Sequence, residues 1–142
     1  MYHFGGVYAD LDVIPLGTFP SQLPILRNTH TNLSAISYLG YMGDKSYKHS
    51  IPNAFMVSST AGHPFWLRPL EFIKEHQHNT TYNNYPEYLT GPVALRGCVL
   101  EWETERELRA IAGELAEVVV LPSDKVIVPH FPRRDTSTQV LR

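Results

Sequence analysis

The sequence has a single cysteine, no cluster of basic residues and no long apolar stretch. Because Cys98 stands alone, no disulfide can form within the chain, and the cysteine content does not indicate a redox compartment. The 12 Lys and Arg against 14 Asp and Glu give a formal net charge of -2. This balance argues against nucleic acid as a partner and against a polybasic membrane patch. A membrane-spanning helix needs about 18 or more consecutive apolar residues, and neither such a run nor a signal segment is found.

What the chain does have is enough apolar residues for a core. Its 142 residues, of which 43% are hydrophobic, suit one folded domain rather than a disordered segment. We expect the domain to cover residues 1–132 and a flexible tail to follow at 133–142. Apolar runs bounded by Gly, Pro and polar residues predict strands at 7–13, 25–26, 33–42, 54–57, 118–121 and 126–128.

The most informative segment runs from Phe4 to Leu16 and reads FGGVYADLDVIPL. Apolar residues alternate there with Tyr8, Asp10 and Asp12, which predicts a short strand with one buried face and both acids on the other. Mg²⁺ and Mn²⁺ prefer oxygen ligands and are commonly held by one or two carboxylates while phosphates and waters complete the shell. The pattern therefore favours a metal-diphosphate site, although an Asp-x-Asp pair also occurs at ordinary solvated strand ends.

A second segment, residues 53–66, reads NAFMVSSTAGHPFW and predicts a strand followed by a helix that His63 and Pro64 open. A histidine in this place is expected to cap the helix or to pack against it rather than to do chemistry. The helix carries an apolar stripe that we expect to be core, made of Trp66, Leu67, Leu70 and Ile73.

A third segment, Thr90-Gly91-Pro92, predicts a tight helix start whose backbone N–H groups are free to face an anion. The buried face of that helix is predicted to comprise Leu95, Cys98, Val99 and Trp102. Thr104 and Glu107 have the spacing of a capping box, which predicts a further helix. Its expected buried stripe is Leu108, Ile111, Ala112 and Leu115.

These three segments resemble those of DXD-motif glycosyltransferases of family 32, the fungal α-mannosyltransferases and inositol phosphoceramide mannosyltransferases. The matching patterns are GGxYxDxD, NAFMxSxxGHPF and TGPxxL, and together the resemblance covers roughly residues 1–130. It implies an α/β fold, namely the C-terminal portion of a GT-A-like (Rossmann-like) catalytic domain. It also implies that the chain is a fragment, because the base-binding half and a membrane anchor of such a protein precede this motif.

The resemblance also implies roles for particular residues. Asp10 and Asp12 would be the catalytic carboxylates and would hold Mn²⁺ or Mg²⁺. The donor sugar and its surroundings would be contacted by Tyr8, Asp10, Asn53, Thr90 and Gly91. The family usually has a C-terminal His near a Ser-Trp pair as a third metal ligand. This chain lacks the pair, and His130 is the candidate substitute.

The implied reaction is transfer of a sugar from a nucleotide donor, with GDP-mannose favoured, to a glycan or a glycolipid such as inositol phosphoceramide, with retention of configuration. The full-length parent would be membrane-associated in the Golgi or the ER lumen. The acceptor, the linkage and the choice between GDP and UDP stay open at this point.

Two other interpretations remain. The run from Asp10 to Val13 also fits the DxDx(T/V) motif of haloacid-dehalogenase-like phosphatases, in which the first Asp is the nucleophile, but the downstream acidic pair which that motif requires is not found in the sequence. Alternatively, the chain is a truncated or degenerate transferase that folds and does no chemistry.

Overall fold

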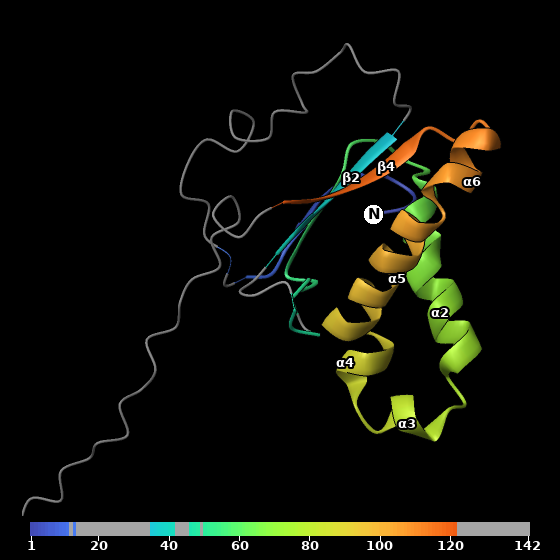
Figure 1. The fold of residues 1–142 in the computed structure, drawn as a ribbon. Helices are drawn as coiled ribbons and strands as arrows, with labels where there is room; N and C mark the ends of the chain where they lie inside the picture. Colours follow the sequence, from blue (N-terminus) through green and yellow to red (C-terminus); the bar gives the residue numbers. More distant parts are fainter. Residues whose placement is uncertain (12, 14–34, 42–45, 49, 122–142) are drawn as a thin grey trace, which may run out of the picture.

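The computed structural model describes residues 1–11, 13, 35–41, 46–48 and 50–121. This part of the chain is a mixed α/β structure in which a four-stranded sheet carries helices packed on one face (Figure 1). The α/β class predicted from the sequence is thereby confirmed. The expected boundary at residue 132 lies outside the described residues.

The strands of the sheet lie in the order β1-β3-β2-β4. Their bounds are Gly6–Ala9 for β1, Ala35–Gly40 for β2, Phe55–Ser58 for β3 and Ala116–Leu121 for β4. Strand β3 is antiparallel to both β1 and β2, whereas β2 and β4 are parallel. β2, β3 and β4 confirm the strands predicted near 33–42, 54–57 and 118–121, whereas those predicted at 25–26 and 126–128 lie outside the described residues.

The first strand differs from its prediction. It ends at Ala9, and all four of its residues are exposed rather than having one buried face. Leu11, expected on that face, is fully exposed. The strand is short because the N–H of Val13 donates to the carbonyl of Asp10 at 3.0 Å, so the chain turns there. Within the described part it lies at the sheet edge.

Helical segments connect β3 to β4. They are the 3-10 turn η2 at Pro64–Leu67, α2 at Arg68–His76, α3 at Thr80–Asn83, α4 at Pro86–Leu89, α5 at Pro92–Thr104 and α6 at Arg106–Ile111. His63 caps η2 as predicted, because its Nδ1 accepts the N–H of Phe65 at 3.2 Å. Among these helices none is both long and apolar enough to cross a membrane.

The core lies between α5, η2 and the sheet. The predicted buried face of α5 is confirmed, since Leu95, Cys98, Val99 and Trp102 are all buried. Burial raises the pKa of the Cys98 thiol to about 12, so this side chain packs as a small apolar group. Phe65 stands edge-on to Trp102, with ring centroids 5.6 Å apart.

The capping box predicted for the next helix is wrong. Thr104 is the last residue of α5, and its hydroxyl donates to the carbonyl of Leu100 at 2.8 Å. The N-cap of α6 is Glu105, which makes no capping hydrogen bond through its side chain. The Thr104 hydroxyl thus already donates a hydrogen bond within its own helix and does not cap the next one.

The apolar stripe expected on the same helix is also wrong. Leu108 and Ile111 are 69% and 84% exposed, and Leu115 is exposed as well. The side of α6 that packs carries Arg109, whose guanidinium carbon lies 3.6 Å from the centroid of the Trp102 ring. α6 therefore contacts α5 through the stem and planar head of an arginine.

A pocket beside the Asp10 strand end

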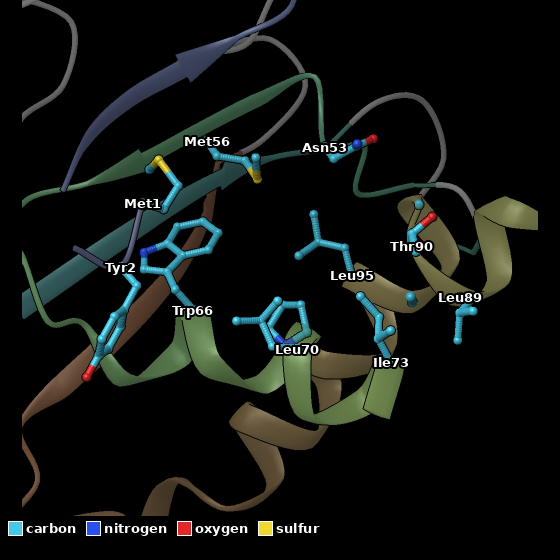
Figure 2. A pocket seen from close by; sticks show the side chains of 13 residues that line it. Met1, Tyr2, Asn53, Met56, Trp66, Leu70, Ile73, Leu89, Thr90 and Leu95 are labelled. Carbon is cyan, nitrogen blue, oxygen red and sulfur yellow. The ribbon is translucent and has the colours of Figure 1, made fainter. Parts of the chain in front are cut away.

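Of the apolar stripe expected to be core, Trp66 is buried in the core as predicted, whereas Leu70 and Ile73 of α2 line a pocket. No residue of α2 is buried, and Leu70 is 60% exposed. The pocket has a volume of about 330 Å³ and lies between β3 and helices α2, α4 and α5 (Figure 2). Its lining consists of Met1, Tyr2, Asn53, Met56, Trp66, Pro69, Leu70, Ile73, Leu89, Thr90, Gly91, Ala94 and Leu95. This volume falls in the range of small-molecule sites.

The polar side chains of this lining are unevenly distributed. Figure 2 shows Asn53 and Thr90 toward one end of the pocket and Trp66, with Met1 and Tyr2, toward the other. We call the first the polar end and the second the Trp66 end. Between them the walls are aliphatic. The pocket can therefore orient a ligand by hydrogen bonds at one end while its body offers only apolar contact.

The polar end is built by the junction of two helices. Thr90 closes α4, and both its backbone N–H and its hydroxyl donate to the carbonyl of Pro86, at 2.8 and 3.1 Å. Gly91 is the N-cap of α5, and a Cβ on it would lie 2.6 Å from the Cα of Glu87. Only glycine permits this approach of the two helices. Pro92 occupies the first turn, so the predicted helix start is confirmed.

Asp10 is placed beside this end by the sheet. Its backbone N–H donates to the carbonyl of Ala54 at 2.9 Å. Asp10 therefore lies opposite the residue that directly follows Asn53. Tyr8 is paired with Met56, a residue of the pocket wall. Directly opposed residues of antiparallel strands share a face, and side chains two apart on one strand do too. Tyr8 and Asp10 thus belong to the face of the sheet on which the pocket lies.

The two side chains are also joined to each other. The Tyr8 hydroxyl donates to Oδ1 of Asp10 at 2.8 Å. This hydrogen bond, reinforced by the carboxylate charge, raises the pKa of Tyr8. The phenol therefore stays protonated and holds one carboxylate oxygen of Asp10.

The chemistry of Asp10 fits a hard divalent cation, because an exposed carboxylate oxygen is the ligand that Mg²⁺ and Mn²⁺ take. Within the described ranges, no three His, Cys, Asp or Glu side chains come together as a metal-binding group. Asp12 and His130, the other predicted ligands, lie outside those ranges. The metal site therefore stays a prediction. Asp10 is the predicted ligand that lies among the described residues, and its chemistry suits the ion.

The structure thus brings together Asn53, Thr90 and Gly91 around one end of a pocket, with Tyr8 on the adjoining strand β1 and Asp10 directly after it. Sequence reasoning missed the apolar part of the pocket. The apolar stripe through Trp66 and Leu70 was visible as helix periodicity. However, a stripe that lines a pocket has the same sequence pattern as one that packs against a sheet. The contributions of Met1 and Tyr2 had no signal in the sequence.

Comparisons of the chain with family models, with curated proteins and with solved structures found no match. The likeness to the DXD glycosyltransferases accordingly rests on the three sequence segments alone.

Proposed function

We propose that this chain carries catalytic residues of a metal-dependent, retaining glycosyltransferase of the GT-A type. The reaction would move a sugar, mannose from GDP-mannose in the first instance, to a hydroxyl of a glycan or glycolipid. The observation that carries the proposal is the convergence of its three family-like segments. Asp10 is hydrogen-bonded to Ala54, and the neighbouring Asn53 lines one pocket with Thr90 and Gly91.

Each of these residues has a task that suits its chemistry. Asp10 would orient the donor and, with Asp12, hold Mn²⁺ or Mg²⁺ near the diphosphate. Tyr8 fixes the Asp10 carboxylate through its 2.8 Å hydrogen bond. The amide of Asn53 and the hydroxyl of Thr90 would bind hydroxyls at the reacting end of the pocket. When bound, the divalent ion supplies Lewis-acid stabilisation of the charge on the departing diphosphate.

The remaining walls support transfer rather than hydrolysis. Leu95 is a buried apolar side chain between the two ends of the pocket, and an apolar wall there would limit the access of water to the reacting sugar. The proposal extends to location, since a parent protein with this activity would be held at the membrane of the Golgi or the ER, with its catalytic part in the lumen.

Calorimetric titration tests the proposal. The chain is titrated with GDP-mannose and with UDP-glucose, each with and without Mn²⁺. We expect binding of one nucleotide sugar only when Mn²⁺ is present. Asp10→Asn removes one charge at nearly constant shape and is expected to weaken that binding at least tenfold, as is Asp12→Ala.

Glu107→Gln is the matched control, because it removes a carboxylate charge from an exposed position on α6. It should bind like the unaltered chain. If a folded chain binds neither nucleotide sugar, or if Asp10→Asn binds as tightly as Glu107→Gln, the proposed donor site is wrong.

A further inference from the structure

The body of the pocket is unsuited to a sugar. Among the described residues that line it none has a charged side chain, and the side chains between its two ends are apolar. A saccharide in the body of the pocket would leave buried hydroxyls without hydrogen-bond partners, which is costly. A hydrocarbon chain carries no such groups and would be favoured by the same walls.

One wall residue also lacks cover. Leu70 lines the pocket from α2, yet it is 60% exposed, whereas Trp66 and Leu95 on other walls are buried. An apolar ligand that enters beside α2 would cover Leu70 and extend the contacts of Ile73 and Trp66. Asn53 at the polar end precedes Ala54, whose carbonyl accepts the N–H of Asp10, so the head of such a ligand would lie near the proposed transfer site.

From these features we infer that the pocket binds the alkyl chain of an amphiphilic acceptor, with the chain reaching toward Trp66 and the polar head held by Asn53 and Thr90. The occupant is a lipid-linked hydroxyl compound rather than a free glycan. The statement about the acceptor rests on the proposed function, whereas binding of an alkyl chain by the pocket rests on the geometry alone.

A series of alkyl glucosides provides the probe. Octyl, nonyl and decyl glucoside share one uncharged head and are titrated below their critical micelle concentrations, with affinity measured by calorimetry and by tryptophan fluorescence. Each methylene buried in an apolar site should tighten binding about fourfold. Fluorescence should change with the same dissociation constant, because Trp66 lines the pocket, and Trp66→Phe should remove most of the change.

Substitutions at two leucines distinguish binding in the pocket from binding elsewhere on the surface. Leu70→Gln places an amide on the pocket wall, and Leu100→Gln makes the same exchange at an exposed position of α5 outside the pocket. We expect Leu70→Gln to weaken decyl glucoside binding about fivefold or more and Leu100→Gln to leave it unchanged. Because both leucines are exposed, neither exchange opens the core, and circular dichroism confirms folding.

The outcomes divide cleanly. Affinity independent of chain length, or equal effects of Leu70→Gln and Leu100→Gln, would overturn the alkyl-chain site even if Mn²⁺-dependent nucleotide-sugar binding is intact. Chain-length-dependent binding that Leu70→Gln weakens would support the site even where no nucleotide sugar binds, and in that case the proposed transfer reaction fails alone.

Discussion

His63 and Glu117, which are 54 positions apart in the sequence, are joined by a hydrogen bond of 2.9 Å between Nε2 of the ring and the backbone carbonyl. The other ring nitrogen, Nδ1, accepts the N–H of Phe65 and so carries no proton. The histidine is therefore neutral with its proton on Nε2, and it ties the start of η2 to strand β4. Protonation would remove the acceptor for Phe65 and place a charge in a fully buried position.

We predict that His63 makes the protein less stable as the pH is lowered. Burial lowers the pKa of His63 below its usual 6.5, so the unfolded chain takes up the proton first. Stability is then lost as pH falls below about 6.5, by at most about 1.4 kcal/mol per pH unit from this group. Urea unfolding between pH 5 and 8 measures the slope. His63→Gln should flatten it, and the exposed His78→Gln should not; an equal slope in all three proteins would contradict the assignment.

Two glycines of the same helix region should respond in opposite directions to alanine. At Gly91 the new methyl would lie 2.6 Å from the Cα of Glu87 and force α4 and α5 apart, so we expect a loss of about 1–3 kcal/mol. At Gly97, inside α5, a Cβ meets nothing within 4 Å. Gly97→Ala should therefore stabilise the protein by about 0.5–1 kcal/mol. Denaturant unfolding of both variants measures the difference, and a neutral Gly91→Ala would refute the close approach.

Two arginines of α6 should differ in their contribution to stability. Arg109 is buried against the face of the Trp102 ring, so Arg109→Ala loses a desolvated cation–π contact and apolar packing, at a cost of about 2 kcal/mol. Arg106 makes an ion pair with Glu117 at 2.8 Å, but its side chain is 69% exposed, and Arg106→Ala should cost at most about 0.5 kcal/mol. Equal costs in thermal unfolding would show that the stacking on Trp102 contributes little.

The hydrogen bond between Tyr8 and Asp10 should matter for ligand binding more than for folding. Tyr8→Phe keeps the ring and frees Oδ1 of Asp10 from its fixed orientation. Because the pair is exposed, we expect a loss of about 1 kcal/mol in Mn²⁺-dependent nucleotide-sugar binding, or about fivefold, and little change in the unfolding midpoint. Calorimetry measures the first quantity and urea unfolding the second. Unchanged affinity would exclude Tyr8 from the site.

Features set by local chemistry were predictable from the sequence. The cap at His63, the helix start at Gly91-Pro92 and the buried face through Cys98 and Trp102 depend on neighbours in the chain or on helix periodicity, and all three are confirmed. The grouping of Asn53, Thr90 and Gly91 was predicted as well, although through a family resemblance and not through spacing.

Features decided by packing partners were not predictable. The alternation around Val7 and the stripe through Ile111 match buried elements in pattern, yet both are exposed, because burial depends on what lies opposite and a pattern carries no record of that. The pocket wall at Leu70 was misassigned for the same reason. Asp12 and His130 stay predictions, since both lie outside the described residues.

Among the described strands β1 lies at the edge of the sheet, and this position affects how fast its amides exchange with solvent. Asp10 donates to Ala54, and because hydrogen-bonded pairs alternate along an antiparallel ladder, the N–H of Tyr8 also points inward to β3. The N–H groups of Val7 and Ala9 then point outward, away from β3. Deuterium should enter at these two positions in advance of the flanking ones, with a period of two. The carboxylate proposed for sugar transfer thus directly follows a strand that, among the described strands, is paired on one side only.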